Sequence, residues 1–353
     1  MSFLKNAWYC AGWSSGIENS PILRRFLDEP VVLYRTEGGE ATALSDICPH
    51  RFAPLHKGKL VGDNIECPYH GLQFNAAGAC AHNPHGSGRI PQGSNVRRYP
   101  LVESQNAAWI WMGDLALADP ELIPDLGMFD ADFCPWITEH LHLAIDYRLL
   151  IDNLLDLSHA SYLHPGTLTP ARAKREMYFT QEGNNVKSSY IQRDIPTPGS
   201  QSPFFSEERG DYHSEIEWLL PGIFRNRLIM TAVGRPPEEG SLMCNTLLIT
   251  PETETSCHFL YAGTRNRQMH NSQIDEVLRK MTNIAFKDED EPMMMDCQAY
   301  MGGRDLTDLK PIYLETDESD IRARRILEKA IRDEQAGVTD RVDTPMMFAS
   351  VGQ

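Results

Sequence analysis

Two short loops in the first part of the chain constrain its fold more than any other stretch of the sequence. The first reads Cys48-Pro-His50 and the second reads Cys67-Pro-Tyr-His70, with sixteen residues between His50 and Cys67. A proline follows the cysteine in both loops. Each loop offers one thiolate and one imidazole, and both groups are ligands of transition metals. We therefore expect a fold in which the two loops lie side by side around a metal group.

The order of these ligands favours one kind of metal group. Two cysteines on one iron and two histidines on the other are the ligand set of a Rieske [2Fe-2S] cluster. A Cys2His2 zinc site uses the same four side chains. In the usual zinc finger both cysteines precede both histidines, whereas here they alternate, so the Rieske cluster is favoured. Three nearby histidines lack the Cys-Pro context, and we expect structural roles for them: His56, His82 and His85.

Length and composition exclude several classes of protein. The 353 residues suffice for two domains with a substantial core. A formal net charge of −16 argues against nonspecific nucleic-acid binding, which relies on clustered Lys and Arg. No apolar run approaches the roughly 20 residues of a membrane-spanning helix. The N-terminus lacks a signal-peptide pattern. In a chain without a signal peptide, eight cysteines are typical of reduced thiols or metal ligands, so we expect a cytoplasmic protein.

The pattern of elements predicts two domains. The first hundred or so residues read as short strands and Gly-bearing turns, which is typical of a small all-β domain. A Pro- and Asp-rich connection follows at about 115–127. Helical segments at about 144–163 and 272–300 then flank several strand-like stretches, which favours an α+β domain with an antiparallel sheet. We predict a Rieske domain over 1–118, a catalytic domain over 119–340 and a tail over 341–353.

A second set of candidate ligands lies in the first of these helical segments. Asp152, Asp156 and His159 recur at spacings of four and three, so a helix would carry them on one side. Acids and an imidazole beside a leucine-rich core are costly unless they are paired or bind a metal. Pro165 ends the helix at His164, and a turning chain would bring His164 to His159.

Two imidazoles and one carboxylate on one face are the ligands of a mononuclear non-haem Fe(II) centre, which keeps open positions for dioxygen. The alternative for this segment is an ordinary helix with an Asp–His hydrogen bond and a capping histidine. The neighbouring cluster, as a source of single electrons, favours the iron centre.

These motifs together carry a resemblance to a known family. The stretches "FLKNAWY", "CPHRFAPL", "CPYHGLQF", "NPHG" and "DNLLDLSHASYLH" resemble the Rieske non-haem iron aromatic ring-hydroxylating oxygenases, and among them the oxygenase components of vanillate-type O-demethylases. The resemblance implies an N-terminal Rieske domain, a C-terminal helix-grip domain and a homotrimer. It also implies a separate NAD(P)H-dependent reductase that carries flavin and an iron–sulfur centre.

The resemblance also implies roles for individual residues. Asp156 matches an acid that links a cluster histidine of one subunit to an iron histidine of its neighbour, and Asn153 matches a polar residue close to the iron. The third iron ligand falls in "EDEP", where Asp290 is preferred and Glu291 is the runner-up. The remaining ligands are Cys48, His50, Cys67 and His70 for the cluster, and His159 and His164 for the iron.

The activity implied is that of a terminal oxygenase. With O2 and electrons from the reductase, it would hydroxylate the methyl group of a methoxylated aromatic acid and so release formaldehyde. Ring hydroxylation or N-demethylation at the same iron is the alternative within the family. A Rieske electron-transfer protein without oxygenase activity is the alternative of another class.

Overall fold

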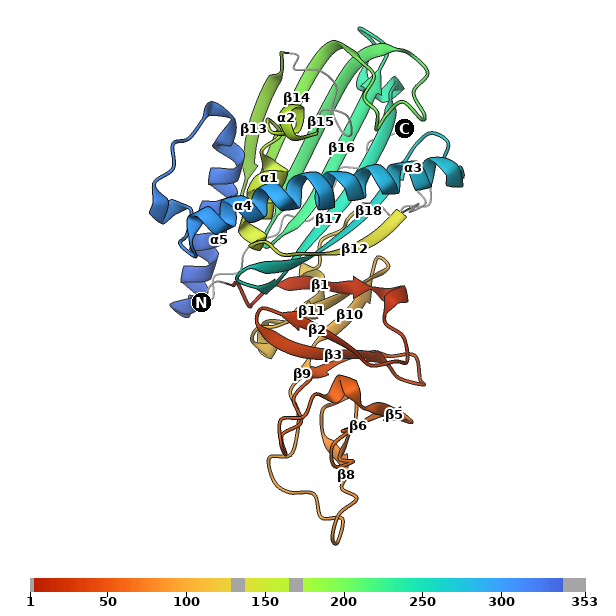
Figure 1. The fold of residues 1–353 in the computed structure, drawn as a ribbon, viewed down its shortest axis with the longest axis vertical. Coiled ribbons are helices and arrows are strands. Elements are labelled where there is room, and N and C mark those ends of the chain that lie inside the picture. Colours follow the sequence, from red (N-terminus) through yellow and green to blue (C-terminus); the bar gives the residue numbers. More distant parts are fainter. Residues whose placement is uncertain (1–2, 128–136, 165–173, 339–353) are drawn as a thin grey trace. The chain divides into compact units, whose positions relative to one another are not determined.

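The computed structural model describes residues 3–127, 137–164 and 174–338, so the predicted tail at 341–353 lies outside the described residues. The described chain divides into two compact units (Figure 1). The first holds Phe3–Ile123 together with Thr250–Thr253, and the second holds Pro124–Ile249 and the chain from Glu254 onward.

The first unit is built from strands alone apart from short 3-10 turns, as predicted. Its described strands form three antiparallel sheets, in the orders β1-β11-β10, β2-β3-β4-β9 and β5-β6-β7-β8. Every residue of β11, "AAWIW", is buried, because the strand lies between two neighbours inside the core. The strands are β1 (Trp8–Trp13), β2 (Ile22–Phe26), β3 (Glu29–Arg35), β4 (Ala41–Ser45), β5 (Lys59–Val61), β6 (Asn64–Glu66), β7 (Gln73–Phe74), β8 (Cys80–His82), β9 (Arg98–Tyr99), β10 (Leu101–Ser104) and β11 (Ala107–Trp111).

A short segment from far along the chain completes this first unit. Thr250–Thr253, the last four residues of the strand β17 (Ser241–Thr253), group with it rather than with the rest of their own hairpin. The amide of Leu27 donates to the carbonyl of Pro251 at 3.0 Å, and the Thr250 hydroxyl donates to the carbonyl of Cys10 at 2.7 Å. The first unit is therefore not made from one continuous piece of chain.

The second unit is dominated by a long antiparallel sheet. Among the described residues this sheet has seven strands in the order β12-β18-β17-β16-β15-β14-β13, so that hairpin after hairpin adds to one edge. The strands are β12 (Ile137–Leu143), β13 (Glu176–Glu182), β14 (Asn185–Pro196), β15 (Arg209–Leu219), β16 (Ile223–Thr231), β17 (Ser241–Thr253) and β18 (Ser256–Arg265).

Helices lie across one face of this sheet (Figure 1). The long helical run of α3, a π-helical segment and α4 contacts the sheet through Phe286, whose ring centroid lies 4.5 Å from that of Phe259 on β18. The helices are α1 (Tyr147–Leu155), α2 (Ala160–Leu163), α3 (Ser272–Asn283), the π-helix (Ile284–Asp290), α4 (Glu291–Met301) and α5 (Glu318–Gln335). The α+β architecture predicted from the sequence is confirmed. No helix in the described ranges is long and apolar enough to cross a membrane.

The first predicted helix of this unit differs from the expectation. It is not continuous over 144–163, because α1 ends at Leu155 and Asp156 leaves the helical conformation at φ −76° and ψ 88°. The expected shared helix side of Asp152, Asp156 and His159 therefore does not form. Asp152 instead forms a buried ion pair with Arg324 of α5, which fixes α1 against that helix.

A half-buried acid, Asp320, lies in the first turn of α5. Burial, with the charges of Asp152 and Asp317, raises the pKa of Asp320 to about 8, and its Oδ1 atom is buried without a hydrogen-bond partner. The folded chain therefore binds more protons than the unfolded chain between pH 3.8 and about 8, so stability should fall as pH rises through this window.

We expect Asp320→Asn, which cannot ionise, to unfold at a temperature that depends less on pH between 5 and 8 than the wild type does. Thermal unfolding measured at both ends of this range tests the idea. Glu315→Gln, at an exposed position near the same helix end, is the control and should follow the wild type. Equal pH dependence in wild type and Asp320→Asn would contradict the argument.

Candidate metal centres

The two Cys-Pro loops of the first unit have the same backbone closure. In the first loop the Cys48 amide donates to the carbonyl of Ala53 at 3.0 Å, and the Cys48 carbonyl accepts from the amide of Phe52 at 2.9 Å. In the second loop Cys67 makes the matching pair of bonds, to Leu72 at 2.8 Å and from Gly71 at 3.0 Å. Each cysteine thus holds the residues four and five positions after it.

The same closure places two residues in the left-handed region. Phe52 has φ +58° and Gly71 has φ +71°, and each is the fourth residue after its cysteine. Glycine adopts this conformation without a steric cost, whereas phenylalanine does not. A Cβ atom at Gly71 would also lie 3.1 Å from the ring of Pro84. The loop geometry is thus kept in the first loop although its residue type disfavours it.

The loops bring the four predicted cluster ligands together. Cys48 and Cys67 are both buried in one hydrophobic cluster of the first unit, and burial, with the nearby Cys67, raises the pKa of Cys48 to about 11. The ring centroids of His50 and His70 are 4.5 Å apart. Burial and the nearby positive groups lower the pKa of His70, which favours the neutral imidazole, and its Nδ1 atom is buried without a hydrogen-bond partner. Two buried thiols and two adjacent imidazoles, one with an unused nitrogen, fit a Rieske cluster.

Of the three other predicted histidines of this unit, His56 and His85 make contacts within it. The ring of His56 lies 2.6 Å from the buried carboxylate of Asp46, and that carboxylate also accepts from the His56 amide. The ring of His85 contacts the backbone carbonyl of His70 at 2.8 Å and so supports the second loop. His82 lies exposed in β8.

A second centre lies in the other unit. Ligand atoms of His159, His164 and Asp290 all lie within 4.8 Å of one another, and among the described residues they form a set that could hold a metal ion. The Asp290 Oδ1 atom is 3.1 Å from the Nε2 of His164 and 3.6 Å from the Nε2 of His159. His164 and Asp290 are almost completely buried, whereas about a quarter of the His159 side chain is exposed.

The turns around the two helices position these three side chains. His159 precedes α2 and His164 follows it, so that one short helix presents both rings, with centroids 5.3 Å apart. Asp290 ends the π-helical segment, directly before α4. Pro292 has no amide hydrogen to bond to the carbonyl four residues earlier, which accounts for an irregular helix at this point. Such π-helical segments are frequent at functional sites.

Further side chains orient the three candidate ligands. The Nδ1 atom of His164 lies 2.7 Å from a carboxylate oxygen of Glu289, and the Nδ2 of Asn153 donates to Asp290 at 3.1 Å. The Nδ1 of His159 bonds to the backbone carbonyl of Asp156. Each imidazole therefore directs its Nε2 atom towards Asp290, as histidine ligands do when their other nitrogen is engaged.

The electrostatics of this centre favour a cation. Burial opposes a charge on His164, but the carboxylates of Asp290 and Glu289 outweigh it and raise the pKa of this histidine. A site that attracts a proton between an imidazole and a buried carboxylate will also attract a metal cation. Two imidazoles and one carboxylate suit non-haem Fe(II).

The remaining predicted residues are placed as follows. Asp156 accepts from the amide of Ser158 at 2.8 Å through Oδ1, while its Oδ2 lies 3.8 Å from His159. The runner-up Glu291 lies outside the set: its carboxylate accepts from the amide of Ala144 at 2.8 Å and pairs with Lys287 at 2.6 Å. Two contributors were missed from the sequence, Glu289 beside His164 and Arg175 beside the turn before His159. In the sequence, the position of Glu289 next to Asp290 could have indicated its role, whereas no pattern indicates the role of Arg175.

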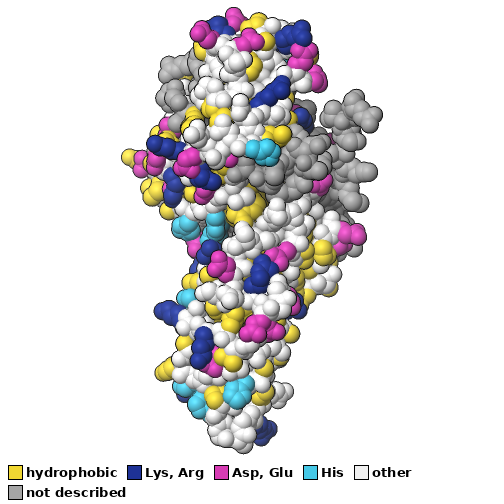
Figure 2. All heavy atoms as spheres, turned by 90° about the vertical axis from the view of Figure 1, so that its right-hand side faces the viewer, with side chains coloured by type: hydrophobic (Ala, Val, Ile, Leu, Met, Phe, Trp, Pro, Cys, Tyr) yellow, Lys and Arg dark blue, Asp and Glu magenta, His cyan; other side chains and the backbone are white. Residues whose placement is uncertain are grey.

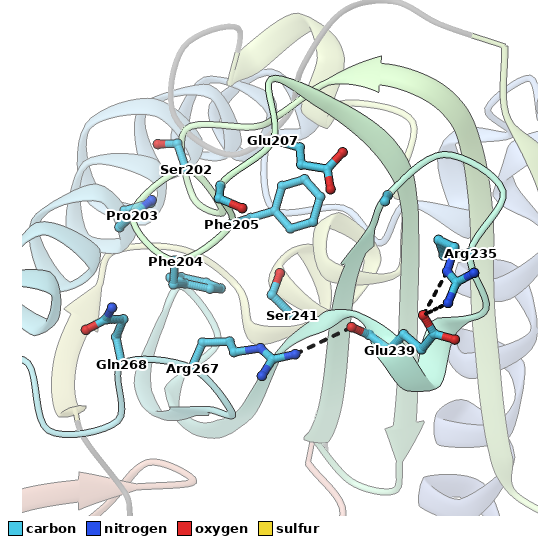
Figure 3. A pocket seen from close by; sticks show the side chains of 12 residues that line it. Ser202, Pro203, Phe204, Phe205, Glu207, Arg235, Glu239, Ser241, Arg267 and Gln268 are labelled. Carbon is cyan, nitrogen blue, oxygen red and sulfur yellow. Dashed lines mark hydrogen bonds and ion pairs between the residues drawn. The ribbon is translucent and has the colours of Figure 1, made fainter.

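A cavity of about 690 Å³ lies at the loops that join the sheet strands (Figure 3). Phe204, Phe205 and Arg267 line it, and Arg267 contacts the carbonyl of Glu239 at 3.5 Å. Arg235 forms an ion pair with Glu239 at 2.6 Å. None of the candidate metal ligands lines this cavity.

Comparisons with known proteins agree with both centres. Residues 7–100 match the Rieske [2Fe-2S] domain, and residues 143–333 match the vanillate O-demethylase oxygenase C-terminal domain. The dicamba O-demethylase oxygenase component of Stenotrophomonas maltophilia is 37% identical over 93% of this chain and 98% of that protein. The chloroacetanilide N-alkylformylase oxygenase component of Rhizorhabdus wittichii is 35% identical over 94% of this chain and 97% of that protein.

Solved structures agree as well. The crystal structure of dicamba monooxygenase bound to 3,6-dichlorosalicylic acid superposes with a TM-score of 0.88 at 35% identity, over 95% of this chain and 100% of that one. The cofactors expected from the sequence, a Rieske [2Fe-2S] cluster and a mononuclear non-haem iron, are thereby supported at the level of the fold. This chain belongs to the Rieske non-haem iron oxygenases, and its catalytic domain is of the vanillate O-demethylase type.

Proposed function

We propose that this chain is the terminal oxygenase of an O-demethylase system and acts on a methoxylated aromatic acid. A separate NAD(P)H-dependent reductase with flavin and an iron–sulfur centre would supply its electrons. The observation that carries the proposal is the convergence of His159, His164 and Asp290 within 4.8 Å, in a chain that also holds the Rieske loops. The names of its relatives, which include O-demethylases, support the reaction type.

The proposed ligands divide between the two groups. Cys48, Cys67, His50 and His70 hold the cluster; His159, His164 and Asp290 hold the iron. When bound, the cluster supplies electrons one at a time and the ferrous iron supplies open positions for dioxygen. The burial of Cys48 and Cys67 keeps water from the thiolates.

The residues around the iron site have orienting roles in this proposal. Glu289 holds the ring of His164 through its Nδ1 atom, and Asn153 holds Asp290 through a 3.1 Å hydrogen bond. The other amide atom of Asn153, Oδ1, is buried without a hydrogen-bond partner. Asn153 can therefore accept a hydrogen bond from a molecule bound beside the iron.

Asp156 is proposed to link the two centres between chains. Its Oδ1 is engaged by Ser158, while its side chain remains about a quarter exposed and its backbone carbonyl contacts His159. A partly exposed carboxylate whose Oδ2 lies 3.8 Å from His159, a proposed iron ligand, can meet His70 of another copy. We therefore propose a homotrimer in which the cluster of one chain serves the iron of the next.

The proposed reaction is an oxidative demethylation. One oxygen atom of O2 enters a C–H bond of the methoxy group, and the other leaves as water after two electrons and two protons are taken up. The resulting hemiacetal loses its C–O bond to give a phenol and formaldehyde. The chain positions the reacting groups, delivers the electrons and provides a site that excludes competing reactions.

The reaction type can be tested by its products. With a reductase, NAD(P)H and a panel of methoxybenzoates, we expect formaldehyde and the matching phenol in equal amounts, one of each for every O2 consumed. Methyl-free hydroxybenzoates serve as the control and should give no formaldehyde. Hydroxylated product without formaldehyde would instead indicate ring hydroxylation, and formaldehyde only from N-methyl substrates would indicate N-demethylation.

The third iron ligand can be tested by substitution. Asp290→Asn removes the buried carboxylate charge between the imidazoles, so we expect loss of the mononuclear iron and of turnover, with the cluster retained. Glu291→Gln is the matched control, because the neighbouring acid is engaged by Ala144 and Lys287, and it should keep the iron. Metal analysis together with the visible spectrum of the cluster measures both. Iron loss in Glu291→Gln alone would overturn the assignment.

The linking role of Asp156 can be tested separately from iron binding. In Asp156→Ala we expect normal iron content and normal cluster reduction, but slow reoxidation of the reduced cluster when substrate and O2 are added. Rapid mixing with detection of the cluster absorbance measures this step. Glu182→Ala, an exposed acid in β13, is the control. Unchanged reoxidation in Asp156→Ala would refute the link.

A further inference from the structure

Arg175 is hydrogen-bonded to the turn that carries His159. Its guanidinium donates one hydrogen bond to the backbone carbonyl of Leu157 and a second to the hydroxyl of Ser161. These two residues lie two positions before and two positions after His159. One side chain therefore holds the chain on both sides of a proposed iron ligand.

The same guanidinium rests on the sheet. Its central carbon lies 4.7 Å from the ring centroid of Tyr190, which is buried in β14. A planar guanidinium can stack on an aromatic ring while its fork of N–H groups binds elsewhere, which an ammonium group cannot do. Tyr190 belongs to a hydrophobic cluster that includes Leu157 and Phe205 at its margin. Arg175 thus connects the turn to β14 of the long sheet.

The turn needs such a tie because it has little regular structure of its own. α1 ends at Leu155 and α2 begins at Ala160, so the residues between them lie outside both helices. The two histidines also differ in support. His164 is almost fully buried and contacts the carboxylate of Glu289. His159 is partly exposed, and its Nδ1 bonds to the backbone carbonyl of Asp156 and lies 3.8 Å from the carboxylate of the same residue, within the same turn.

We propose that Arg175 is a positioning residue for the iron site, which holds the turn from Asp156 to Ser161 so that His159 keeps its place opposite Asp290. The inference rests on the proposed iron ligands. Among the described residues, the hydrogen bonds of Arg175 go to the backbone of Leu157 and the hydroxyl of Ser161, and to none of the three proposed iron ligands. Its guanidinium holds the backbone beside His159, whereas the carboxylate of Glu289 contacts the ring of His164 directly.

The test measures iron retention, which needs no substrate. In Arg175→Ala we expect the mononuclear iron to pass to a ferrous chelator roughly tenfold faster or more, as is typical when an outer partner of a metal ligand is removed. The content, visible spectrum and EPR signal of the cluster should stay those of the wild type. Arg175→Lys should be intermediate, because an ammonium keeps the charge but loses the fork.

Chemical rescue and a matched control separate positioning from general stability. Low-millimolar guanidinium should slow iron release from Arg175→Ala and leave the wild type unchanged. Arg209→Ala is the control, because Arg209 pairs with the exposed Asp194 on the same sheet, and it should retain iron as the wild type does.

Two results would overturn the inference: wild-type iron release in Arg175→Ala, or loss of iron and cluster together with a lower unfolding temperature and no rescue. A wild-type protein that binds no mononuclear iron would overturn the proposed function as well, so the two failures are distinct.

Discussion

The catalytic unit depends on one buried carboxylate that lies between two imidazoles. The Oδ1 of Asp290 is 3.1 Å from His164 and 3.6 Å from His159, in a place that water hardly reaches. Such a group is costly to bury unless a cation or hydrogen-bond donors compensate it. The π-helical segment before α4 carries this carboxylate, the short α2 presents both imidazoles to it, and the amide of Asn153 donates a hydrogen bond to it. Phe286, in the same π-helical segment, packs against Phe259 of the long sheet.

The first unit holds its candidate metal ligands with two loops of the same backbone geometry. Two loops of different sequence close on their cysteines with the same two backbone hydrogen bonds, and each puts its fourth residue at positive φ. The histidine lies two residues after the cysteine in one loop and three in the other. Equivalent backbones with unequal spacing allow the two rings to approach from different directions, 64° apart in plane.

Features that depend on local sequence patterns are predictable from the sequence. The Cys-Pro loops, the α+β class and the histidine pair around residue 160 could be predicted because proline and ligand spacing act over a few residues. Asp290 needed family resemblance, since 126 positions separate it from His164. The common helix side of Asp152 and His159 was wrong because α1 stops at Leu155, and the partner of Asp152 lies 172 residues away. Glu289 and Arg175 likewise act through contacts that only the folded chain creates.

The end of β17, Thr250–Thr253, bears on how such a protein can be divided. It belongs to the first unit although the rest of β17 and all of β18 belong to the second. A fragment cut at the connection near Ile123 would leave the hydroxyl of Thr250 and the carbonyl of Pro251 behind, and Cys10 and Leu27 would lose these contacts. The continuous chain from Phe3 to Ile123 is therefore not the whole of the first unit. Swapping it between relatives requires that the hairpin tip of the oxygenase half be exchanged with it.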